Sequence, residues 1–211
     1  MATKRKPVPA AWGAVIFLIA VVMVFAVIRV TIDWSNLTSG VVPPEGEFDR
    51  RYALQPALAY AHIIPGVVYL LLAPFQVSRR FRNRHLELHR RIGRFLVPTG
   101  VVTGVFAVVF GFFFSFGGFA EASATLVFGV YFVVALLVAF GAIRAGDQIR
   151  HRRWMIRAFA IGLGVGSIRL WVGLFQATGL LTFEAAFGVA FWIAFVIHAI
   201  AAEIWLRLRP T

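Results

Sequence analysis

Three ionisable residues lie inside long apolar runs of the sequence: His62, Arg169 and His198. Each costs roughly a few kcal/mol in the hydrocarbon core of a membrane, so each requires a partner, a cavity or a ligand. Arginine keeps its charge, and a neutral imidazole can accept a hydrogen bond or bind a metal. We predict that the three converge on one cavity as a cofactor-binding or proton-transferring site. The alternative is that each bonds separately to a helix backbone.

Two basic stretches, at 78–94 and 144–157, carry histidines in addition to their arginines: His85 and His89 in the first and His151 in the second. Attraction to anionic lipid explains the arginines but not the histidines. We expect the stretches to meet as one surface with an anionic group between them, because their like charges repel. His89 and His151 form a second candidate cofactor site. The basic residues of this surface are Arg82, Arg90, Arg91, Arg94, Arg150, Arg153 and Arg157.

The sequence contains no cysteine, which excludes disulfides, thiolate metal sites and iron–sulfur clusters. We assign no metal site, and the cofactor is unknown, with haem b as one candidate. Glu203 lies close to the basic residues near the C-terminus, and we expect it to pair with an arginine there.

The elements that must position these residues are six apolar runs. The 211 residues are 60% hydrophobic and only 14% charged, whereas soluble domains carry roughly 25% charged residues. We predict one all-α domain over 1–211, a polytopic transmembrane bundle. The predicted spans are about 10–32, 53–77, 92–116, 122–143, 154–178 and 183–206. An outer loop at 33–52 and basic loops at 78–91 and 144–153 connect them.

The charges divide between the two predicted membrane faces. Of 21 Lys and Arg residues, 17 fall on one side, and six of the nine acidic residues fall on the other. The positive-inside rule then predicts cytoplasmic N- and C-termini and a multi-pass protein of the inner (cytoplasmic) membrane. The basic loops are expected to contact anionic lipid headgroups, and the one-sided charge argues against nucleic-acid binding.

The order of several short motifs is similar to that of a family of bacterial and archaeal membrane proteins, domain of unknown function 2306. The resemblance covers about residues 53–170. The family has no settled activity, so the resemblance implies the fold and the set of site residues only. The matching positions are His62, Pro74-Phe75-Gln76, Arg82, His89-Arg90, Gly93-Arg94, His151, Trp154-Met155, Arg157 and Arg169.

Three functions remain open on the sequence alone. The bundle binds haem b and transfers electrons, or it transports a proton-coupled or anionic solute with a kink at Pro65 as hinge. In the third hypothesis, the protein is a small membrane subunit or a lipid-associated protein. Its partner would be a second copy of the chain or another protein of a membrane complex. No motif assigns an enzymatic activity: a Walker loop, a serine elbow and an H-E-x-x-H pair are all missing from the sequence.

Overall fold

The structure is a computed structural model that describes residues 9–208. Within this range six helices are long and apolar enough to cross a membrane, which confirms the all-α prediction with six spans. Two short helices accompany them. The eight are α1 (Pro9–Ser39), α2 (Arg50–Leu54), α3 (Pro56–Val77), α4 (Arg79–Arg84), α5 (Leu86–Phe113), α6 (Gly118–Arg144), α7 (Gln148–Thr178) and α8 (Phe183–Leu208).

Several helices extend beyond the predicted spans into the predicted loops. α1 continues to Ser39, and α4 with the start of α5 occupies most of 78–91. Arginine is a good helix former, and side-chain caps fix the new helix starts. The Ser78 hydroxyl accepts a hydrogen bond from the Phe81 amide at 3.3 Å, and Asp147 accepts one from the Arg150 amide at 2.8 Å. Lys4, Arg5, Lys6 and Arg209, which were counted on the predicted basic side, lie outside the described residues.

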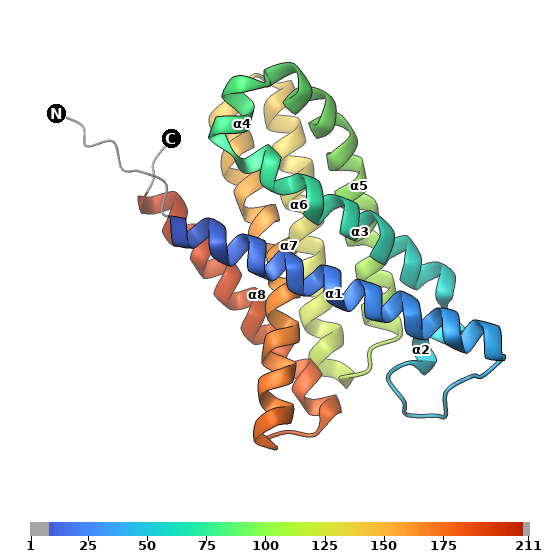
Figure 1. Ribbon diagram of the computed structural model, residues 1–211. Coiled ribbons are helices and arrows are strands. Elements are labelled where there is room, and N and C mark those ends of the chain that lie inside the picture. Colours follow the sequence, from blue (N-terminus) through green and yellow to red (C-terminus); the bar gives the residue numbers. More distant parts are fainter. Residues whose placement is uncertain (1–8, 209–211) are drawn as a thin grey trace.

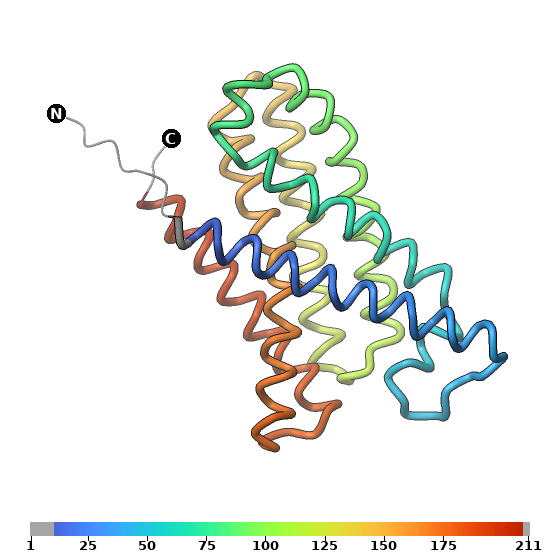
Figure 2. The backbone as a smooth tube through the Cα atoms, in the orientation of Figure 1, coloured from blue at the N-terminus to red at the C-terminus, as the bar shows by residue number. Residues whose placement is uncertain are grey.

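The bundle consists of α3, α5, α6, α7 and α8, and α1 lies across one side of it (Figure 1). α3 packs on α5, α5 on α6, and α7 on both α6 and α8. α1 contacts only α7, α3 and α2 within the described chain, and its span is the least buried of the six. The tube in Figure 2 shows α1 running obliquely over the other helices. It is therefore the helix that the bundle holds most weakly.

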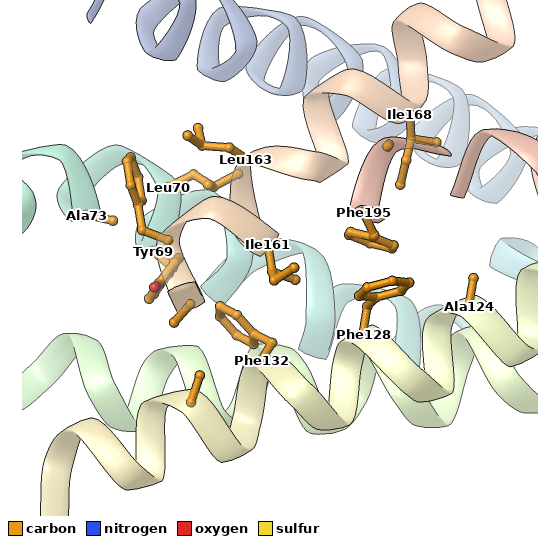
Figure 3. Close-up of a cluster of buried hydrophobic side chains, with 14 of the residues drawn as sticks. Tyr69, Leu70, Ala73, Ala124, Phe128, Phe132, Ile161, Leu163, Ile168 and Phe195 are labelled. Carbon is orange, nitrogen blue, oxygen red and sulfur yellow. The ribbon is translucent and has the colours of Figure 1, made fainter. Parts of the chain in front are cut away.

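The core of the bundle contains aromatic and branched side chains from α3, α6, α7 and α8 (Figure 3). The rings of Tyr69 and Phe132 meet edge to face at 5.3 Å, and those of Phe128 and Phe195 lie 5.1 Å apart. Ile161 of α7 is buried in the same cluster. These contacts tie α3 to α6 and α6 to α8.

Three alternate glycines of α7 allow three different helices to approach it. A Cβ at Gly162 would lie 3.4 Å from the Tyr69 ring of α3, and one at Gly164 would lie 2.8 Å from the Phe195 ring of α8. A Cβ at Gly166 would lie 2.6 Å from the Leu18 carbonyl oxygen of α1. These glycines therefore serve close helix packing, and α7 is the central helix of the fold.

The two ends of the bundle differ in charge. The basic end comprises α4, the starts of α5 and α7, and the end of α8, and most of the arginines lie there. The acidic end comprises 33–55 together with the α5–α6 and α7–α8 connections. It contains Asp33, Glu45, Glu47, Asp49, Glu121 and Glu184.

Candidate functional site

A cavity of about 540 Å³ lies between α1 and the bundle. It extends from Phe48 and Asp49 at the acidic end to Leu70 of α3 and Gly162 of α7 near the middle of the bundle. Most of its wall is apolar and aromatic. Its polar lining residues include Arg29, Asp49, Arg51, Tyr52, His62, Glu121, Thr125 and Arg169.

Arg51 and Glu121 form a buried ion pair in the cavity wall. An Arg51 nitrogen donates to a Glu121 carboxylate oxygen at 2.9 Å and to the Phe114 carbonyl at 3.0 Å. The second Glu121 oxygen accepts from the amides of Phe116 and Gly117 at 2.8 and 2.6 Å. Glu121 is only 2% exposed, so this pair fixes α2 to the start of α6. The Arg51 Nε atom is buried without a partner.

Arg29 of α1 is held by two aspartates. Its guanidinium pairs with Asp33, one turn further along α1, and with Asp49 before α2. The Tyr60 hydroxyl of α3 donates to Asp33 at 2.8 Å. Arg29 also lies over the Tyr52 ring, 4.3 Å from its centre. These contacts join α1 to α2 and α3 at the acidic end.

Arg169 of α7 also lines the cavity, but it has no ion pair with a carboxylate among residues 9–208. It interacts with the Tyr52 hydroxyl, and it lies 5.4 Å from the centre of the Phe25 ring and 5.7 Å from that of Phe187. Glu121 is already engaged by Arg51 and by two backbone amides. Arg169 is therefore a permanent charge without a contacting counterion.

His62 of α3 lines the same cavity. Its Nδ1 lies 3.0 Å from the Thr103 carbonyl oxygen of α5. A carbonyl only accepts, so Nδ1 carries the proton, and in the neutral ring Nε2 retains its lone pair. His62 therefore offers the cavity an acceptor or ligand atom, next to the donors of Arg169.

His198 does not line this cavity, so the expected convergence of three residues is reduced to two. Its Nε2 lies 2.7 Å from the Ser167 hydroxyl of α7, and the ring also bonds to the Ala160 backbone. Ser167 and Arg169 are two residues apart, about 200° around the helix, so they lie on opposite faces of α7. His198 therefore lies on the side of α7 that faces away from Arg169. A path through all three residues is not formed.

Six charged residues line the cavity or pair with its lining, and their charges sum to zero: Arg29, Arg51, Arg169, Asp33, Asp49 and Glu121. These charges are unevenly placed. Two aspartates share Arg29, which leaves surplus negative charge beside α1. Arg51 and Glu121 balance each other. The positive surplus lies at Arg169, deeper in the cavity. An anionic group inside the cavity would meet its complement at this position.

At the basic end, His89 and His151 lie close enough to interact electrostatically. The His151 Nδ1 lies 2.8 Å from the Ala139 carbonyl, so it donates there. The His89 Nδ1 is buried without a partner. Arg82 and Arg152 also interact with each other across α4 and α7. The two basic stretches therefore meet, as predicted, and this end is separate from the cavity.

The remaining predicted basic residues have simpler environments. Arg157 binds Glu203 through two hydrogen bonds, of 2.6 and 3.0 Å, which confirms the predicted pairing of Glu203 with an arginine. Arg91 pairs with Glu87 on an exposed helix face, and the Nε of Arg94 donates to the Arg90 carbonyl at 3.4 Å. Arg90, Arg150 and Arg153 are exposed.

Three residues that line the cavity, Arg51, Tyr52 and Glu121, were not anticipated from sequence, nor was Thr103, the backbone partner of His62. The first two lie in the predicted outer loop or at its edge, and Glu121 lies in a predicted turn. The only signal in the sequence for the Arg51–Glu121 ion pair is weak: an isolated acidic residue lies between two apolar runs, and an arginine lies at the edge of a third. Thr103 contributes through its backbone, which no side-chain pattern indicates.

Comparison with known proteins identifies the family. No curated protein and no solved structure matches the chain. A family described as predicted membrane protein (DUF2306) matches residues 59–206, more than half of the 211 residues. The match includes His62, His89, His151 and Arg169. The chain, a multi-pass membrane protein with six apolar helices, therefore belongs to the DUF2306 family.

Proposed function

We propose that this protein binds, in the cavity beneath α1, a membrane-soluble molecule with an apolar body and one anionic end. The observation that carries the proposal is Arg169, which has no carboxylate partner in a largely apolar cavity. Ring contacts offset part of the cost of this charge, but a guanidinium has five donors. A carboxylate or phosphate accepts from several of them at once.

The walls suit the apolar part of such a ligand. Aromatic rings and small residues of several helices line the cavity, and α1 forms the side toward the membrane. Val24 and Val27 of α1 are 56% and 66% exposed and do not line the cavity, so this helix is bounded by lipid on its other faces. Because α1 makes few contacts, a ligand from the bilayer enters beside it without unfolding the bundle.

Equilibrium binding of oleate and of oleyl alcohol to the purified protein tests this proposal. The two probes share a chain and differ in charge. Arg169→Gln should weaken oleate binding by about thirtyfold, or roughly 2 kcal/mol, and leave oleyl alcohol unchanged. Arg144→Gln is the matched control, because it removes the same charge at the exposed end of α6, outside the cavity. Equal binding of oleate by wild type and Arg169→Gln would exclude the proposed role of Arg169.

A second candidate ligand is haem b, and His62 is the specific observation that favours it. Its Nδ1–H is fixed on the Thr103 carbonyl, an arrangement typical of metal-binding histidines, and Nε2 is left for iron. Arg169 would hold a propionate, and the cavity wall would enclose the ring. A bound haem would supply electron transfer. His62 is the one histidine among the described lining residues, so we expect a single protein ligand to the iron.

Addition of haemin to the purified protein separates the two candidates. Under the haem assignment the protein gains a Soret band of a five-coordinate haem, and His62→Ala abolishes it. His198→Ala is the control, because His198 lies outside the cavity. A spectrum that is unchanged by His62→Ala would reject haem and leave the anionic lipid-like ligand.

We also propose that the basic end faces the cytoplasm and that the protein lies in the inner (cytoplasmic) membrane. The support is the sequence count of 17 basic residues on one side against six of nine acids on the other. In this orientation the cavity is in the outer half of the bilayer, and α2 covers its outer end.

A further inference from the structure

The basic end of the bundle contains buried side-chain nitrogens without a hydrogen-bond partner. Gln76, near the end of α3, is only 8% exposed, and its Nε2 has no partner. The Nδ1 of His89 is also buried and unpartnered. Buried polar atoms are nearly always satisfied in folded proteins, so these two indicate an acceptor that the chain itself does not provide.

His89 lies on α5, and Gln76 of α3 faces the same side of that helix. His89 and Gly93 are four residues apart and therefore neighbours on that helix. Gly93 faces Gln76, because a Cβ at Gly93 would lie 3.4 Å from the Gln76 side-chain oxygen. His151 at the start of α7 interacts with His89 from the other side. Side chains from three helices, α3, α5 and α7, thus lie around one position, and the unpartnered nitrogens among them belong to Gln76 and His89.

The charged groups that act on His89 and Arg152 are all basic. Arg82 acts on both His89 and Arg152, and Arg79 also acts on Arg152. None of these three arginines has an ion pair with a carboxylate among the described residues. The ion pairs of this end belong to Arg91 and Arg157 instead. Like charges that gather without a counterion favour an anion between them.

A water molecule would satisfy Gln76 and His89 but would leave the arginines unbalanced. A phosphate group provides both the acceptor oxygens and the charge. We propose that Gln76, His89, Arg82 and Arg152 form a binding site for a phosphate group. The phosphate belongs to a membrane lipid or to a soluble phosphorylated molecule, and the site recognises the chemistry that the two share.

The test uses the full-length protein in an uncharged detergent at constant ionic strength, with two anionic probes and one control. The probes are dihexanoyl phosphatidic acid and inorganic phosphate, and the control is dihexanoyl phosphatidylcholine, which has no net charge. Gln76→Leu should weaken binding of the preferred probe at least about tenfold, since it removes a neutral donor to an anion. Gln76→Glu, of the same shape, should abolish binding by repulsion. Arg84→Gln, exposed on α4, should leave affinity within about twofold.

Tighter binding of phosphatidic acid would identify a lipid headgroup, and tighter binding of inorganic phosphate would identify a soluble ligand. The proposal is wrong if neither probe binds more tightly than chloride or phosphatidylcholine. It is also wrong if Arg84→Gln weakens binding as much as Gln76→Leu, since the attraction would then be diffuse. If the Gln76 variants do not fold, His89→Leu provides the same test, because it removes the other unpartnered nitrogen. Arg169→Gln should not alter phosphate binding, so the proposed phosphate site is tested independently of the proposed cavity ligand.

Discussion

Glu121 of α6 accepts a 2.9 Å hydrogen bond from Arg51 of α2, across 70 residues of sequence. Both side chains lie in the wall of the cavity, and Glu121 also caps the two amides that precede α6. This pair holds α2 over the acidic end of the cavity. It explains how a segment between two spans, which reads as a loop, becomes part of a binding site.

Glu121→Gln should therefore destabilise the protein strongly. The change leaves the Arg51 charge buried without its counterion, at a cost of about 3 kcal/mol. The measurement is the thermal or chemical unfolding midpoint of the purified protein. Glu45→Gln is the control, because Glu45 is 92% exposed and lies 3.8 Å from Arg50. Equal midpoints for the two variants would show that the buried pair contributes nothing.

The position of α1 depends on Gly166. Gly166→Ala would place a methyl group 2.6 Å from the Leu18 carbonyl oxygen, and a backbone atom cannot move aside as a side chain does. We expect a loss of about 1–3 kcal/mol of stability and a more weakly held α1, measured by limited proteolysis near its ends. Gly173→Ala on the same helix meets nothing within 4 Å and should be neutral or slightly stabilising. Unchanged proteolysis of Gly166→Ala would contradict the close packing of α1 on α7.

The proposed orientation predicts the location of both ends of the chain. A reporter that functions only in the cytoplasm should be active when it is fused after Thr211, and one that functions only outside the cytoplasm should be inactive there. A second reporter inserted in the 40–48 segment, at the acidic end, should be active only on the opposite side. Activity of the Thr211 fusion outside the cytoplasm would reverse the orientation of the whole bundle.

The sequence predicted the spans because each is an apolar run of sufficient length, and it identified Arg169 and His62 because ionisable residues inside such runs are costly. It also placed Glu203 beside an arginine. Depth along a helix can be counted from the sequence, but the direction in which a side chain points depends on packing. His198 shows the limit: its position along the helix allowed a site shared with Arg169, and yet it bonds to Ser167 on the opposite face of α7.

The oblique position of α1 could not be predicted, because its apolar residues show no face that prefers the bundle. The cavity exists only because α1 crosses α7 at Gly166 and then diverges toward the acidic end, where Arg29 holds it. The Arg51–Glu121 pair was unpredictable for a related reason. It joins residues from two connecting segments, whose approach is decided by the helices between them.

The measurement that tests the central proposal most directly is photo-crosslinking with a fatty acid that carries a diazirine on its chain. We predict labelled peptides from the cavity wall, at Phe25 of α1 and Val165 of α7, and loss of this labelling with excess oleate or in Arg169→Gln. A second hollow of about 520 Å³ on the outside of the bundle, between α6 and α8, provides the comparison. Labelling confined to its residues Val127, Ile200 and Ile204, with none in the cavity, would contradict the proposal.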